Sequence, residues 1–122
     1  MSNTKTKNKN SFFQFSLKNE IIKAVKEMGF NHPTPIQKKV IPHLISSDQD
    51  LIASAQTGTG KTAAFGLPLL SKTKINDSHV QTLILCPTRE LCMQIANDLI
   101  GYSKYLKDIK ILAVYGGAKI EK

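Results

Sequence analysis

Apolar residues near the N-terminus recur at steps of four, four and three residues: Leu17, Ile21, Val25 and Met28. This spacing places them on one face of an amphipathic helix, which we expect over residues 17–28. Ser16 suits the N-cap of this helix, and Gly29 suits the position after its last turn. The pattern therefore predicts a helix that packs one face on a core.

Three further helices are predicted by start signals or by periodicity. Thr34 followed by Pro35 is a typical N-cap and first helical residue, and Pro42 is expected to kink or end that helix. Another helix is expected to begin at Lys61 and run to about Leu67. A long amphipathic helix is expected from Arg89 to about residue 106.

Short apolar runs separate these helices, at residues 51–55, 82–86 and 109–115. Runs of this length are typical of buried strands. Strands that alternate with helices predict an α/β fold in which a parallel sheet is flanked by helices. The 122 residues suit one small domain, over 12–122.

The charge favours a polyanionic partner, because 17 Lys and Arg face 9 Asp and Glu, for a net charge of +8. Three of the lysines lie in the polar stretch 1–11, which we expect to be a disordered basic tail; without them the balance is 14 − 9 = +5. The chain has no apolar run long enough to cross a bilayer, and its first ten residues lack the apolar core of a secretory signal.

The cysteine and histidine content argues against a disulfide framework or a zinc site. Cys86 and Cys92 are the two cysteines, and their spacing does not match a metal or redox motif. We expect both to be reduced and buried, in a cytoplasmic protein. The three histidines are scattered without metal-ligand spacing.

The strongest chemical signal is a Gly-rich segment between a predicted strand and a predicted helix. It consists of Ala55, Gln56, Thr57, Gly58, Thr59, Gly60, Lys61 and Thr62. This is the context of a phosphate-binding loop, in which backbone N–H groups and a helix N-terminus converge on phosphate. Lys61 would contact the β- and γ-phosphates, and the Thr62 hydroxyl would bind Mg²⁺. The alternative is a chance Gly/Thr-rich turn, which the combination of strand, loop and helix disfavours.

Four segments, in order, resemble the motifs of DEAD-box RNA helicases. Residues 29–37, ending in Pro-Thr-Pro-Ile-Gln, resemble the Q motif, and residues 55–62 are similar to motif I, including its initial alanine. Pro87-Thr88-Arg89-Glu90-Leu91 looks like motif Ia, and Gly116-Gly117 resembles the GG element. The resemblance extends from Phe12 to the end of the chain, and it implies a RecA-like P-loop fold, incomplete in this chain.

The resemblance also implies residue roles. Gln37 would read the adenine edge of ATP, and Phe12 would stack on the adenine, with Phe13 and Phe15 nearby in sequence. The loop at 55–62 would bind the phosphates and Mg²⁺. RNA backbone contacts would come from the motif Ia and GG residues, namely Pro87, Thr88, Arg89, Gly116 and Gly117. Contacts to the backbone predict RNA binding that is largely independent of sequence and sensitive to salt.

Each of these roles has a structural alternative. Gln37 lies three residues after Thr34, so its side chain could simply return a hydrogen bond to the helix start in a capping box. Phe12 could be a core residue, Arg89 could lie in an exposed first helical turn, and Gly116-Gly117 could be a turn that ends a strand.

The sequence ends before the Asp-Glu-Ala-Asp box, the Ser-Ala-Thr motif and the second domain that the resemblance leads one to expect. We therefore expect this polypeptide alone neither to hydrolyse ATP nor to unwind RNA. In the RecA-like arrangement that the resemblance implies, the strand between the P-loop strand and the motif Ia strand would come from sequence beyond Lys122. The sheet would then have a gap at its centre, and we expect the polypeptide to be marginally stable. The alternatives are a non-catalytic RNA-binding remnant and, in view of the P-loop alone, a different nucleotide enzyme such as a small-molecule kinase or GTPase.

Overall fold

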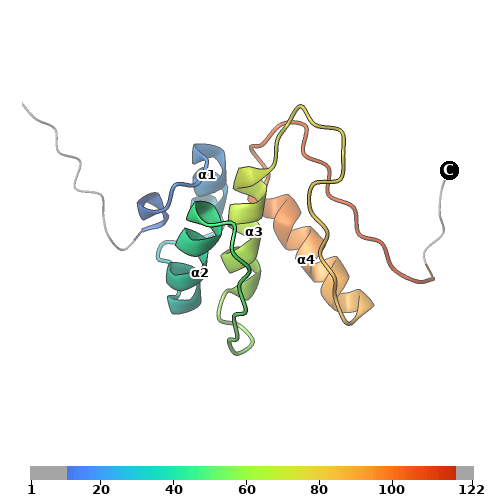
Figure 1. Cartoon of the computed structure of the whole chain (residues 1–122), viewed down its shortest axis with the longest axis horizontal. Coiled ribbons are helices and arrows are strands. Elements are labelled where there is room, and N and C mark those ends of the chain that lie inside the picture. The colour runs from blue at the N-terminus through green and yellow to red at the C-terminus, as the bar shows by residue number, and fades with distance from the viewer. Residues whose placement is uncertain (1–10, 118–122) are drawn as a thin grey trace, which may run out of the picture.

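The computed structural model describes residues 11–117, in which a short 3₁₀ turn precedes four α-helices (Figure 1). The elements are η1 (Phe12–Gln14), α1 (Asn19–Glu27), α2 (Pro35–Ser46), α3 (Lys61–Lys72) and α4 (Arg89–Tyr102). The predicted basic tail lies outside the described residues, except for Ser11. No helix within the described part is long and apolar enough to span a membrane.

The helices form where the sequence predicts them, with shifted ends. α1 begins two residues later than the apolar spacing indicates, and Gly29 adopts a positive φ of 87° after its C-terminus. Pro42 does not end α2, which continues for four residues beyond it. α3 likewise passes through Pro68 and ends at Lys72, five residues beyond the predicted Leu67. α4 ends at Tyr102 rather than near residue 106.

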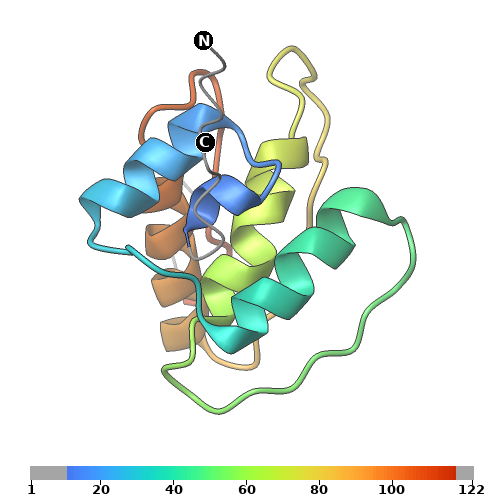
Figure 2. The same ribbon diagram turned by 90° about the vertical axis from the view of Figure 1, so that its left-hand side faces the viewer.

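The helices pack around α3, which lies between α2 on one side and α4 on the other (Figures 1 and 2). α1 contacts both α3 and α4. Ile21, Val25, Ile41 and Leu67 are among the fully buried side chains of this core. α3 and α4 approach closely at Gly66, where an added Cβ would lie 2.7 Å from the Leu99 side chain. The core is therefore built between helices.

The predicted parallel sheet is not formed among the described residues. Residues 51–55, 82–86 and 109–115 are extended but carry no strand hydrogen-bonding pattern. A strand needs a neighbouring strand for its N–H and C=O groups, whereas a helix satisfies those groups within itself. Within residues 11–117 the extended segments do not pair with one another, so the expectation of a formed parallel sheet was wrong there. The unpaired segments are consistent with an incomplete RecA-like fold.

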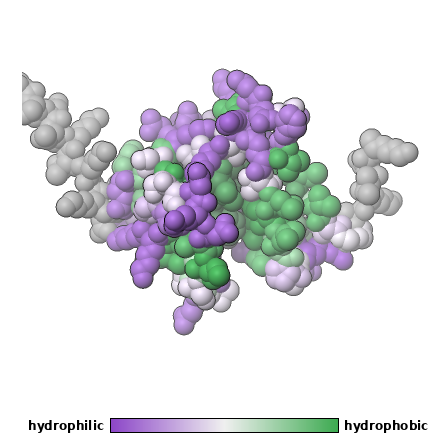
Figure 3. Space-filling view, viewed as in Figure 1, coloured by the Kyte–Doolittle hydropathy of each residue, from purple (hydrophilic) through white to green (hydrophobic). Residues whose placement is uncertain are grey.

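The last extended segment nevertheless shows the alternating burial of a strand that has one face against a core. In the last segment, Ile109, Ile111, Ala113 and Tyr115 are half-buried and alternate with exposed residues. Ile84, Ile109 and Ile111 pack against the helical core. The opposite face is also apolar but is left in solvent: Val80, Leu83, Leu85, Leu112 and Val114 are 78–88% exposed. Figure 3 shows a hydrophobic area on this side of the molecule.

Candidate functional site

The Gly-rich loop curls directly into the N-terminus of α3. Gly58 and Gly60 have φ values of 77° and 83°, the left-handed region that favours glycine. The Thr59 hydroxyl donates a hydrogen bond to the Gln56 carbonyl at 2.5 Å, which closes the turn. Lys61, the first residue of α3, is exposed, and Thr62 is half-buried. The loop thus presents a cation at a helix N-terminus, an arrangement suited to anionic phosphate.

Gln37 connects this loop to α2. Its side chain is only 3% exposed. The backbone N–H of Thr34 donates to Gln37 Oε1 at 2.9 Å, and Gln37 Nε2 donates to the Gly60 carbonyl at 3.2 Å. The first bond is the helix-start contact of the capping-box interpretation. The second bond reaches the Gly-rich loop, so Gln37 is more than a helix cap.

The carboxamide of Gln37 retains hydrogen-bonding capacity beyond these two contacts. An amide nitrogen has two hydrogens and an amide oxygen has two lone pairs, and each atom uses one here. A donor and an acceptor side by side match the N7 and N6 positions of adenine. The structural and the base-reading interpretations of Gln37 are therefore chemically compatible.

The aromatic residues near the N-terminus divide between the core and the surface. Phe12 is 3% exposed, and its ring meets that of Phe15 in an edge-to-face contact with centroids 6.0 Å apart. Phe13 is 55% exposed. A hollow of about 420 Å³ is lined by both Phe12 and Phe13, together with Phe30 and its neighbours. Phe12 is thus a core residue here, and its stacking on adenine stays a prediction.

Residues 87–89 lie at the start of α4. Thr88 is the N-cap, and its hydroxyl accepts a hydrogen bond from the Leu91 N–H at 3.2 Å. Pro87 and Arg89 are exposed. The interpretation of Arg89 as part of an exposed first helical turn is therefore correct, and it leaves the guanidinium accessible to a ligand. The capping role of Thr88 was not predicted, although a threonine directly before a helix is its usual signal.

Two predicted site residues that are distant in sequence come together at this point. An added Cβ on Gly117 would lie 3.6 Å from Arg89 Nη2, so the GG element approaches the start of α4. Gly117 has a φ of 83°, and Gly116 is exposed. Tyr115 joins them, with its ring centroid 5.7 Å from Arg89 Cζ. Tyr115 was not among the predicted site residues, although an aromatic residue next to two glycines was an available signal.

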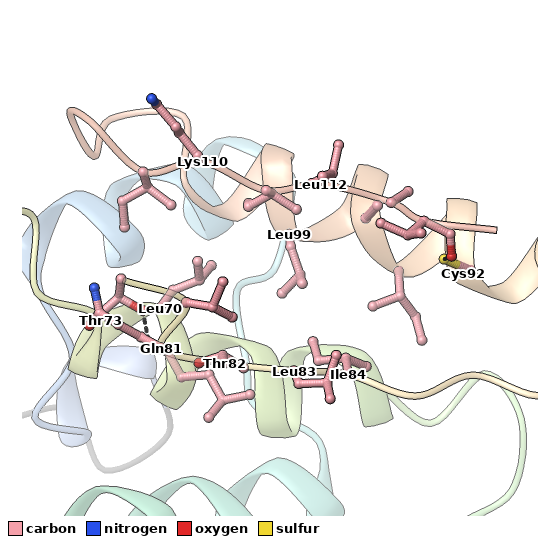
Figure 4. Close-up of a pocket in the computed structure, with 18 of the residues that line it drawn as sticks. Leu70, Thr73, Gln81, Thr82, Leu83, Ile84, Cys92, Leu99, Lys110 and Leu112 are labelled. Carbon is pink, nitrogen blue, oxygen red and sulfur yellow. Dashed lines mark hydrogen bonds between the residues drawn. The ribbon is translucent and has the colours of Figure 1, made fainter. Parts of the chain in front are cut away.

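A large apolar space separates the two C-terminal extended segments (Figure 4). Its volume is about 1360 Å³, and it is lined by residues 80–89 and 108–116 with Leu70 and Leu99 from the helices. Figure 4 shows Leu83 and Ile84 on one extended segment and Leu112 on the other, with Leu99 between them. This space is the gap between the unpaired segments, and polar residues from 73–79 line it as well.

Both cysteines lie beside this space. They are free and half-exposed, so the expectation that they are buried was wrong. Burial of the thiol, with a smaller contribution from Cys92, raises the pKa of Cys86 above its usual value. Cys92 donates a long hydrogen bond to the Val114 carbonyl, 3.9 Å from its sulfur. The described residues contain no group of three His, Cys, Asp or Glu side chains that could hold a metal ion.

Comparison with known proteins gives a consistent family match. The sequence model of the DEAD/DEAH box helicase family matches residues 34–122. The chain is 50% identical over 111 residues to the ATP-dependent RNA helicase CshA of Listeria monocytogenes, covering 91% of this chain and 21% of that protein. It is 45% identical over 114 residues to the DEAD-box helicase RhpA of Helicobacter pylori, covering 93% and 23%.

Solved structures agree with this match. A DEAD box protein from the hyperthermophile Methanococcus jannaschii superposes with a TM-score of 0.84 at 38% identity, over 90% of this chain and 30% of that one. S. cerevisiae Dbp5 bound to RNA and ADP BeF3 superposes with a TM-score of 0.77 at 35% identity, over 80% and 25%. The chain spans about a fifth to a quarter of the length of the curated relatives it matches.

Proposed function

This chain belongs to the DEAD/DEAH box helicase family, and from that premise we propose that it is the nucleotide- and RNA-binding part of an ATP-dependent RNA helicase domain. The observation that carries the proposal is the contact between Gln37 and Gly60. It joins a side chain suited to reading a base to a loop suited to binding phosphate. A nucleoside triphosphate has those two features at its opposite ends.

The phosphate end of the proposed site is the loop 55–62 and the N-terminus of α3. The left-handed glycines let the backbone turn sharply, so that N–H groups can face a bound phosphate. Lys61 adds a full positive charge at the same place. The residues also fit Mg²⁺, which keeps several waters and is held mainly by substrate phosphates; Thr62 would supply one hydroxyl ligand.

The base end of the proposed site is Gln37. Its remaining amide hydrogen and lone pair would pair with N7 and N6 of adenine, whereas guanine presents an acceptor at the position of N6. The site is therefore expected to prefer ATP to GTP, which argues against a GTPase. Phe12, or the more exposed Phe13, would contact the ring of the base.

The RNA contacts are proposed at the start of α4 and at the GG element. In support, Arg89 and Gly117 are adjacent and accessible, and together they offer a cation beside a backbone that lacks side chains. Pro87, Thr88 and Gly116 flank them on the same two segments. Such a surface suits the sugar–phosphate backbone, so affinity should depend on salt more than on base sequence.

We expect the polypeptide to bind ATP without turning it over. Phosphoryl transfer needs a group that positions the attacking water and further charges that stabilise the transition state. The roles assigned to this chain are phosphate, base and backbone binding, and none of them supplies that water-positioning group. The test is phosphate release with saturating RNA, and turnover above the rate of a protein-free control would contradict the expectation.

A non-catalytic RNA-binding role is the second candidate, favoured by the fact that Arg89 and Gly117 meet on segments separate from the phosphate-binding loop. Lys61→Ala distinguishes the two. Loss of one charge-assisted phosphate contact should weaken ATP–Mg²⁺ binding by about 10- to 100-fold. If the chain is part of an ATP-dependent helicase, Lys61→Ala should also abolish the effect of ATP on RNA affinity. If wild-type RNA affinity is indifferent to ATP and Lys61→Ala leaves it unchanged, the second role holds.

A further inference from the structure

Tyr115 and Arg89 are brought together by two segments that are distant in the sequence. Arg89 Cζ lies 5.7 Å from the centroid of the Tyr115 ring, within the range of a cation–π contact. Arg89 is exposed, whereas Tyr115 is half-buried at the end of the extended segment that crosses α4. The ring is thus the better fixed of the two partners.

A second contact holds this segment against α4. Cys92, one turn after Arg89 on the helix, donates from its sulfur to the carbonyl of Val114. Val114 directly precedes Tyr115 in the sequence. The backbone that carries the ring is therefore tied to the helix that carries the guanidinium, although no strand ladder is present in the described segment.

Gly117 is a further neighbour of the Arg89 guanidinium. An added Cβ there would lie 3.6 Å from Arg89 Nη2 and 3.9 Å from its Cζ. The guanidinium consequently has the tyrosine ring and the glycine backbone as neighbours, and it remains exposed. A phosphate that approached the Gly117 backbone would meet the same guanidinium.

We propose that Tyr115 is a positioning residue that orients the Arg89 guanidinium toward the RNA backbone. An arginine side chain has much conformational freedom, which it loses on binding a phosphate. An aromatic ring can restrict the guanidinium before RNA arrives while leaving its N–H edges available to phosphate oxygens. The inference rests on the proposed RNA contact of Arg89 and adds the residue that prepares it.

The experiment is a double-mutant cycle on RNA affinity, with a fluorescein-labelled oligouridylate as the probe. Arg89→Ala should weaken binding and lower the slope of log affinity against log salt by about 0.7, the value for one single-strand phosphate contact. Tyr115→Leu should weaken binding by about two- to fivefold, the effect of an exposed cation–π contact. Tyr115→Phe keeps a ring and should bind like the wild type.

The cycle separates positioning from direct contact. In the Arg89→Ala background, Tyr115→Leu should cause no further loss, because the side chain that it orients is gone. Tyr105→Leu, three residues beyond the C-terminal end of α4, is a matched control and should not change RNA affinity. Circular dichroism of each variant checks that the helices persist, and recovery by Tyr115→Phe excludes a loss that comes only from misfolding.

Two results would overturn the inference and can be told apart. If Arg89→Ala weakens binding but Tyr115→Leu acts equally with and without Arg89, Tyr115 contacts RNA itself or acts elsewhere, and the positioning role is wrong. A Tyr115→Leu variant with wild-type affinity leads to the same conclusion. If Arg89→Ala has no effect on affinity or on the salt slope, the proposed RNA contact itself fails, and with it the reason for orienting Arg89.

Discussion

The helical part of the molecule and its C-terminal extended segments differ in how they satisfy the backbone. Helices α1 to α3 pair their N–H and C=O groups internally and bury one shared core. The segments at 80–86 and 109–115 have one face against that core, but they have no strand partner in the described structure. Gln37, Gly60 and Lys61, the residues proposed to bind the nucleotide, belong to the first region. The Gly-rich loop and its contact with Gln37 are therefore formed although no paired strands are present within residues 11–117.

The largest effect is expected from Gly60→Ala, in the helical region. Gly60 is left-handed, and an added Cβ would overlap the Gln37 amide nitrogen. The left-handed conformation costs about 1–2 kcal/mol for a residue with a Cβ, and overpacking costs about 1–3 kcal/mol more, for about 2–5 kcal/mol in all. The free energy of unfolding, measured in urea, should fall accordingly.

Gly58→Ala is the matched control for this substitution. Gly58 is also left-handed, with a φ of 77°, but a Cβ there would meet none of the described atoms within 4 Å. Gly58→Ala should therefore lower the free energy of unfolding only by the cost of the left-handed conformation, about 1–2 kcal/mol. Equal losses for the two variants would show that the contact between Gln37 and Gly60 does not constrain the loop.

A smaller effect is expected from charges placed on the extended segments, and it should depend on the face. Ile84 packs against the core, whereas Leu83 is 78% exposed. Ile84→Lys should lower the free energy of unfolding by about 1–3 kcal/mol, while Leu83→Lys should change it by about 0.5 kcal/mol or less. Urea unfolding of both variants measures the difference.

The same pair tests the exposed apolar face for self-association. An unpaired extended segment with apolar side chains is prone to edge-to-edge association, which an added lysine opposes. Sedimentation velocity should therefore show less concentration-dependent association for Leu83→Lys, and least for Leu83→Lys combined with Leu112→Lys. If the wild type is monomeric throughout, the apolar face is protected in a way that the described structure does not show.

The smallest effect is expected at the surface contact between α1 and the end of α4. The Tyr105 hydroxyl donates to both carboxylate oxygens of Glu27, at 2.5 and 2.6 Å. Lys104 Nζ donates to Glu27 Oε2 at 3.2 Å. These contacts, led by the Tyr105 hydrogen bond, lower the pKa of Glu27 below its usual 4.5. Their stabilisation is thus present above pH 4.5 and is lost as the pH falls through the lowered pKa.

Tyr105→Phe should consequently lower the melting temperature slightly at neutral pH, and less than either glycine substitution. It should also flatten the decline of stability below pH 4.5, because the pKa of Glu27 then moves back toward its usual value. Melting curves between pH 3 and 7 for the wild type and the variant measure this. Identical pH profiles would show that the contact does not contribute in solution.

The helices could be predicted because their signals are local. Thr34 and Pro35 mark the start of α2, and the two glycines before Lys61 mark the start of α3. The passage of α2 through Pro42 and of α3 through Pro68 could not be predicted locally, because packing on both sides of α3 outweighs the lost hydrogen bond and the clash. Gln37 had two interpretations, and its contacts show that one side chain makes the capping bond and also reaches the loop.

The pairing of the strands could not be predicted from the short apolar runs, because such a run indicates an extended segment and not its neighbour. Ile84 and Ile111 face the core as a strand pattern requires, yet their segments lie on opposite sides of a gap. The contact between Arg89 and Tyr115 could not be predicted for the same reason, because local sequence patterns do not show which distant segments meet. Phe12 illustrates a further limit: its position matches a base-contacting aromatic, but burial places its ring in the core.

Gln37 and the loop before Lys61 are proposed to bind the two ends of one ATP molecule. The direct test is displacement of a fluorescent ATP analogue, in the presence of Mg²⁺, by unlabelled ATP and by GTP. If Gln37 reads the base with a paired donor and acceptor, ATP should displace the analogue at a concentration about 5- to 150-fold lower than GTP. Equal displacement by ATP and GTP, or an analogue that does not bind, would contradict the account.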